Sequence, residues 1–288
     1  MSCPCKPTHV TPRLMPAAPV PRSPAMLRAF VLLPALVVLL SSTYQLGAPR
    51  GLAAQTLDPV ELAERLRTGL DEASIAGDDD ALGHTVILAR RAVTAFPDHA
   101  LLNHYMGYAL YLLAQRTMET DMRAAHASLE EAESFLERSI ELQPIAESHA
   151  LLSSALGMRI DGAASAMSLG MRSGAAMGRA KALGPDNPRV RLLEGISAFH
   201  TPSMFGGGHE AALEHFLAAI ELFAEDAPEP PLPAWGHAET YAWLGQTHAA
   251  LGRADEARAA YERALELEPG YVWVREVLLP QLGGGLTP

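Results

Sequence analysis

Residues 238–270 constrain the fold more than any other part of the chain. They read AETYAWLGQTHAALGRADEARAAYERALELEPG and contain two helical patterns joined at Gly252. A glycine there can take the left-handed backbone conformation that ends a helix. Asp255 and Glu256 occupy the first turn of the second pattern, where the helix dipole favours negative charge, and Pro269 closes it. The stretch therefore predicts two antiparallel helices.

The spacing within this helix pair is similar to that of a tetratricopeptide repeat, in which small residues let the two helices approach closely. His248 departs from the pattern, which has an aromatic residue there. We assign repeat-packing roles to these positions: Tyr241, Leu244, Gly245, His248, Ala257, Tyr261, Ala264 and Pro269.

A second copy precedes it, with Gly195, Ala212, Phe216 and Ala219 at the same packing positions. Gly195 and Ala212 are 17 residues apart, whereas Gly245 and Ala257 are 12 apart. The five additional residues predict an enlarged turn over 201–208. We expect Met204 and Phe205 in this turn to pack inside the hairpin core.

Weaker copies close at Pro97, Pro144 and Pro185, which brings the total to about five helix pairs. Between Gly107 and Ala132 the separation is 25 residues, which predicts another long connection. Residues 225–237 form a proline-rich connector, and an apolar segment at about 271–283 is predicted to cap the stack. The fold class is all-α: a right-handed superhelix, or α-solenoid.

The first 54 residues contain no Asp or Glu and are interpreted separately. Residues 1–25 are a proline-rich extension or a mis-assigned start. Residues 26–54 have the layout of a secretory signal peptide, with cleavage expected after Ala53 or Ala54. An uncleaved anchor in the inner membrane is the alternative. Cys3 and Cys5 both precede the signal, so the mature chain, 55–288, would have no disulfide.

Residues 55–288 carry 17 basic and 33 acidic side chains, a formal charge of −16. This charge excludes nucleic acid as a favoured partner. Contact with a membrane is expected only through an uncleaved N-terminal segment.

Four further motifs resemble a family of exported bacterial tetratricopeptide-repeat proteins whose function is unassigned. The motifs are MSLGMRSG, TPSMFGGG, LPAWGH and VWVREVLLP, and the resemblance covers roughly residues 100–281. It implies the repeat fold and export, and it brings no catalytic residues.

The glycine triplet 206–208 and its histidine neighbours do not form a convincing chemical site. No Lys or Arg lies between Arg191 and Arg253, and Glu210 would repel an anion at the helix start. His209 and His215 are six residues apart, so they face different sides of one helix. No nucleophile motif is present. We therefore expect no metal, no cofactor and no enzymatic activity.

The concave face is the stronger candidate site, because the first helix of each repeat lines it. Aromatic and hydrogen-bonding side chains there suit an extended peptide or a helix. For Ile196 and Phe199, structural packing is an equal alternative. The candidate groove residues are His104, Tyr108, Tyr111, Ser154, Arg189, Ile196, Phe199, Glu239 and Gln246.

The sequence thus predicts an exported scaffold or adaptor, periplasmic or extracellular, that binds a protein or peptide through its groove. Two alternatives remain open. One is a small-molecule-binding accessory protein of an envelope transport system, with long loops before Ala132 and Ala212 closing the groove. The other is a helical-repeat hydrolase with its site assembled from separate helices.

Overall fold

The computed structural model describes residues 58–283, and the predicted extension and signal peptide lie outside them. The described residues contain eleven α-helices and no strand. None of these helices combines the length and the apolar character needed to span a bilayer. The prediction of an all-α chain is confirmed for this part of the molecule.

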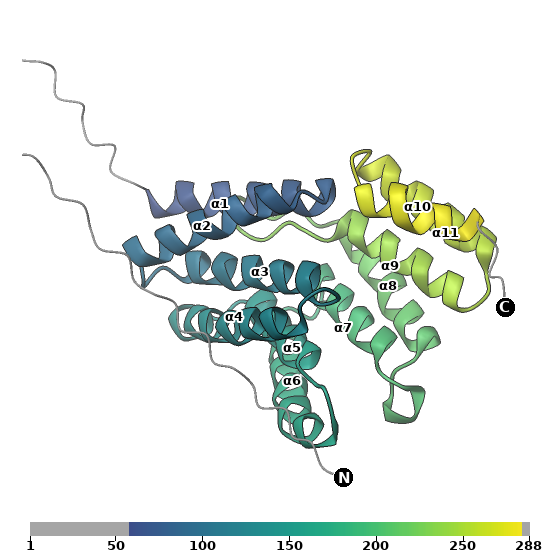
Figure 1. Ribbon diagram of the computed structural model, residues 1–288, viewed down its shortest axis with the longest axis horizontal. Helices are drawn as coiled ribbons and strands as arrows, with labels where there is room; N and C mark the ends of the chain where they lie inside the picture. The colour runs from purple at the N-terminus through teal and green to yellow at the C-terminus, as the bar shows by residue number, and fades with distance from the viewer. Residues whose placement is uncertain (1–57, 284–288) are drawn as a thin grey trace, which may run out of the picture. The chain divides into compact units, whose positions relative to one another are not determined.

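The helices pack as five consecutive pairs (Figure 1). The first helices of the pairs are α1 (Pro59–Ala76), α3 (Ala100–Thr117), α5 (Ala146–Met158), α7 (Pro188–His200) and α9 (His237–Ala250). The second helices are α2 (Asp79–Ala95), α4 (Met122–Leu142), α6 (Ala163–Leu183), α8 (His209–Phe223) and α10 (Ala254–Leu267). This arrangement is the predicted solenoid.

Small residues set the distance between the helices of a pair. A Cβ added at Gly195 would overlap the ring of Phe216, and one at Gly245 would overlap the ring of Tyr261. Both rings are buried, with 0% and 2% of the residue exposed. Because the aromatic ring fills the space that a side chain on the glycine would need, the spacing of these residues along the sequence produces the close pair.

The prediction of a long connection before Ala132 is wrong. The additional residues instead lengthen the helices, since α3 has 18 residues and α4 has 21. Only a short turn separates them, and the Asp121 side chain caps α4 by accepting the N–H of Ala124 at 2.9 Å. Without that loop, the expected closure of the groove at this end does not occur.

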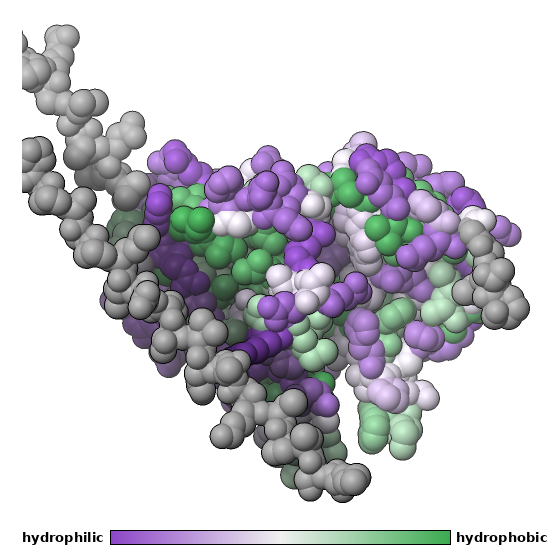
Figure 2. Space-filling model, viewed as in Figure 1, coloured by the Kyte–Doolittle hydropathy of each residue, from purple (hydrophilic) through white to green (hydrophobic). Residues whose placement is uncertain are grey.

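The enlarged turn over 201–208 is present and contains the short 3₁₀ helix η1 (Ser203–Phe205). The packing expected for Met204 and Phe205 is wrong, because these residues are 81% and 72% exposed. The reason lies in the backbone: the Gly208 N–H donates to the Ala198 carbonyl at 2.8 Å, and Gly207 lies against the end of α7 with no room for a Cβ. The tip therefore projects outward as a hydrophobic protrusion at the lower edge of Figure 2.

The C-terminal segment covers α10, but it is not one regular helix. It contains the π-helical segment η2 (Trp273–Leu278) and the short α11 (Leu279–Gly283). Tyr271, Val274 and Leu278 are buried against α9 and α10, and Ile75 of α1 packs against the same cluster. The last segment therefore contacts the first helix as well as the fifth pair.

We predict that Gly245→Ala lowers the free energy of unfolding by about 1–3 kcal/mol, because the new Cβ forces the Tyr261 ring to move. A matched control is Gly178→Ala on α6, where nothing lies within 4 Å of an added Cβ. That change should be neutral or stabilising, by up to about 1 kcal/mol. Urea denaturation followed by circular dichroism compares the two. Equal destabilisation would contradict the packing described here.

Candidate functional site

The predicted groove residues lie on the inner helices α3, α5, α7 and α9, but most are not freely accessible. Those with less than a tenth of their surface exposed are His104, Tyr108, Tyr111, Arg189 and Ile196. The others, Ser154, Phe199, Glu239 and Gln246, are half-buried. A segment of the same chain covers part of this inner wall.

The covering segment is the proline-rich connector between α8 and α9, residues 224–236, which runs beside α3 (Figure 1). The hydroxyl of Tyr105 donates to the carbonyl of Pro231 at 2.5 Å. Four residues later, the Trp235 ring stacks on Tyr108 with the centroids 5.0 Å apart and the planes at 22°. Two side chains of α3 thus hold the second half of the connector.

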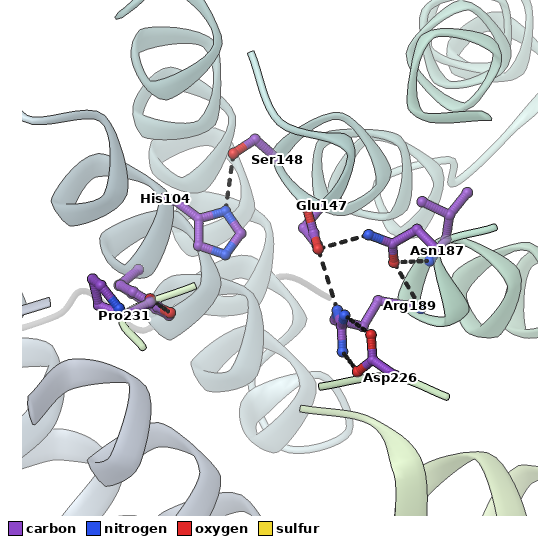
Figure 3. Close-up of polar contacts among 9 residues, drawn as sticks. His104, Glu147, Ser148, Asn187, Arg189, Asp226 and Pro231 are labelled. Carbon is purple, nitrogen blue, oxygen red and sulfur yellow. Dashed lines mark hydrogen bonds and ion pairs between the residues drawn. The ribbon is translucent and has the colours of Figure 1, made fainter. Parts of the chain in front are cut away.

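Arg189 of α7 holds the first half (Figure 3). Its Nη1 and Nη2 atoms donate to the two carboxylate oxygens of Asp226, each at 2.7 Å. Its Nε donates to Glu147 of α5 at 3.2 Å, and Asn187 donates to the same Glu147 oxygen at 2.7 Å. Burial alone would lower the pKa of Arg189, but the bonds and charges of Asp226 and Glu147 outweigh it and raise the pKa.

His104 lies deeper in the same wall and takes no part in holding the connector. Its Nδ1 is 2.9 Å from the hydroxyl of Ser148, which is 3.0 Å from the hydroxyl of Ser139. Complete burial lowers the pKa of His104 to about 4. The ring is therefore neutral near pH 7, and it packs as part of the core.

Two acidic residues on the inner wall have strongly shifted pKa values. Burial, the largest cause, raises the pKa of Asp71 on α1 and of Glu239 on α9 to about 7 each. The Asp71 charge also raises the pKa of Glu239, whereas a hydrogen bond from Trp243 Nε1 at 3.4 Å lowers it. Asp71 Oδ1 is buried without a hydrogen-bond partner.

Sequence reasoning nominated Glu239 and missed Asp71. The first helix pair matches the repeat pattern least well, so its inward positions could not be assigned from spacing. Asp71 and Glu72 both lie between the buried residues Leu70 and Ala73 on α1, so this pair of acids next to buried positions was the available signal, and it does not distinguish half-buried Asp71 from exposed Glu72.

Phe199 lies in an aromatic cluster and is not free on the groove wall. Its ring centroid is 5.4 Å from that of Trp243 and 4.8 Å from that of His209. Trp243 also contacts Trp273 of the C-terminal segment, at 5.7 Å. The packing alternative for Phe199 therefore agrees with these contacts.

Two open hollows flank the 201–208 turn, with volumes of about 480 and 320 Å³. The larger is lined by His200 and His209, and the smaller by Lys181, Glu194 and His215. Among residues 58–283, no group of three or more His, Cys, Asp or Glu side chains could hold a metal ion.

Comparison with known proteins agrees with this architecture. The family model for the tetratricopeptide repeat matches residues 238–271. No curated protein matches the chain. The HusA haemophore from Porphyromonas gingivalis has a similar structure, with 22% identity, a TM-score of 0.55 and coverage of 68% of this chain and 96% of HusA. The tetratricopeptide-repeat protein TTC0263 from Thermus thermophilus has 17% identity, a TM-score of 0.52 and coverage of 78% and 96%. The chain has the tetratricopeptide-repeat fold.

Because the pKa values of Asp71 and Glu239 are raised, the stability of the folded chain should depend on pH, and this dependence can be tested. The ordinary pKa values are 3.8 for Asp71 and 4.5 for Glu239, so at pH values between these and about 7 the folded chain binds more protons than the unfolded chain. Their contribution to stability is therefore largest at low pH and is lost as the pH rises through 7.

We predict that the variant Asp71→Asn with Glu239→Gln gains melting temperature relative to the wild type between about pH 5 and about pH 8, because its side chains cannot ionise. Calorimetry at several pH values measures the difference, and contributions from other groups such as His104 cancel in it. Glu262→Gln, on the exposed side of α10, is the control. A difference that is constant with pH would mean that the two acids ionise normally.

Proposed function

We propose that this protein is an exported scaffold or adaptor that binds an extended segment of a partner protein along its concave face, and that it is not an enzyme. The observation that carries the proposal is that this face already seats an extended segment, the connector of residues 224–236. A wall that holds one extended segment by side-chain contacts has the chemistry to hold another.

The contacts are of the kinds that peptide-binding surfaces use. Tyr105 recognises a main-chain carbonyl, Tyr108 offers a flat aromatic surface, and Arg189 offers two donors to a carboxylate. Proline-rich segments lose little conformational entropy when bound, because they are already extended. Ser154, Glu239 and Gln246 remain half-buried, so part of the inner wall is still accessible to a partner.

Cross-linking at the inner wall tests partner binding. We predict that a photoreactive amino acid at Gln246 or Ser154 captures one discrete partner in intact cells, because both residues are only half-buried on the inner helices α9 and α5. The same amino acid at Glu262, exposed on α10, should not capture it. Tyr108→Ala is a poorer probe, since this buried residue supports the Trp235 ring. Capture at Glu262 alone, or at none of the three positions, would contradict a concave binding face and leave the small-molecule alternative.

Export to the periplasm or beyond the cell surface is proposed from the apolar run in residues 26–54. Its basic start, its short apolar core and the small residues after it are typical of a signal peptide. The segment precedes the described helices, the first of which begins at Pro59.

We predict that the chain isolated from the cell envelope begins at Ala54 or Gln55, because signal peptidase cleaves after small residues. Intact-mass measurement gives the N-terminus directly. An envelope-bound chain that retains residues 26–54 would indicate a membrane anchor, and an unprocessed chain outside the envelope fraction would contradict export.

A further inference from the structure

Three side chains of the inner wall, Arg189, Tyr105 and Tyr108, hold the connector at three points along its sequence. Asp226 binds Arg189, Pro231 follows five residues later with its carbonyl bound to Tyr105, and Trp235 follows after another four residues, stacked on Tyr108. Between these anchors the chain is largely open to solvent: Ala227, Glu229, Pro230 and Leu232 are exposed. The segment therefore contacts the groove as a ligand would, at a few points along an extended chain.

We propose that the connector is an internal competitor, and that the partner is an extended segment with the same chemistry: a carboxylate, a proline-rich stretch and an aromatic side chain. This inference rests on the proposed function and identifies the kind of partner. The partner would bind the positions at Arg189, Tyr105 and Tyr108 that the connector occupies.

Arg189 has contacts within the wall that do not involve the connector, and exchange of the connector would leave them in place. Glu147 holds Arg189 from one side, and Asn187 holds Glu147. When Asp226 leaves, the guanidinium keeps one carboxylate and presents Nη1 and Nη2 to another. Tyr105 and Tyr108 are three residues apart on α3, and both are buried, with 0% and 3% of the residue exposed.

Charge complementarity also favours this partner over a basic one. Arg189, which binds the connector through Asp226, is cationic, and its guanidinium carbon lies 5.8 Å from the ring centroid of Phe223, the last residue of α8. A buried guanidinium whose second carboxylate has departed strongly favours a new anion. An acidic partner segment supplies it.

Covalent linkage gives the connector a large advantage, since short linkers hold a ligand at effective concentrations of the order of millimolar. A free peptide should therefore bind the wild-type chain weakly. Weakening the connector's own anchors should expose the site and strengthen the binding of the same peptide.

The test uses a fluorescent peptide with the connector sequence EDAPEPPLPAWG, residues 225–236. We predict that the variant Asp226→Asn with Trp235→Ala binds it at least about tenfold more tightly than the wild type, measured by fluorescence anisotropy. A peptide with the same two substitutions should bind the variant at least about tenfold more weakly. The control variant, Glu229→Gln with Leu232→Ala, changes exposed connector residues and should behave as the wild type does.

If the anchor variant keeps its helicity and does not bind the peptide, the inference is wrong. If that variant does not fold, hydrogen exchange of the wild-type chain decides. Connector amides that exchange much faster than those of α3 and α7 support release, and connector amides that exchange only with global unfolding overturn it. Failure of the peptide together with successful cross-linking at Gln246 would refute this partner chemistry and leave the scaffold proposal standing.

Discussion

A single buried guanidinium joins three parts of the chain that are far apart in sequence. Arg189 of α7 binds Glu147 of α5 and Asp226 of the connector, and only 2% of its side chain is exposed. Removing such a charge from water costs several kcal/mol, so it is tolerated only because two carboxylates compensate it. The third pair, the fourth pair and the connector therefore have a fixed relation to one another, and the occupied concave face depends on it.

The helix pairs can be predicted from the sequence because their packing depends on residues that are close together in the sequence. A glycine and an aromatic residue at fixed spacing bring two helices together, as Gly245 and Tyr261 do. The same logic fails where two arrangements satisfy one spacing. The separation of Gly107 and Ala132 is consistent with a long loop or with longer helices, and the structure has the latter. Likewise, apolar side chains at Met204 and Phe205 suggested burial, but backbone hydrogen bonds fix the turn with its tip outward.

The sequence was sufficient to predict where the candidate site lies. It was not sufficient to predict that the connector covers this site. Spacing placed Tyr108 and Arg189 on the inner wall, since periodicity assigns the face of a helix. The path of the connector depends on contacts between residues that are far apart in the sequence. The carbonyl of Pro231 accepts a hydrogen bond from Tyr105, which lies 126 positions earlier, and no local sequence pattern predicts such a contact. Asp71 was not nominated because the first helix pair matches the repeat pattern least well, so spacing did not assign its inward positions. The structure thus has a concave face partly covered by the connector, with two acids on the inner wall whose pKa values burial raises to about 7.

The claim that the connector is fixed in the concave face depends most directly on the contact between Arg189 and Asp226. A double-mutant cycle of Arg189→Met and Asp226→Asn, with unfolding free energies measured in urea, isolates their coupling from the effect of Glu147. We predict a coupling of at least about 1.5 kcal/mol, as for close charge pairs removed from water. Additive effects, with a coupling near zero, would mean that the connector does not occupy the concave face in solution.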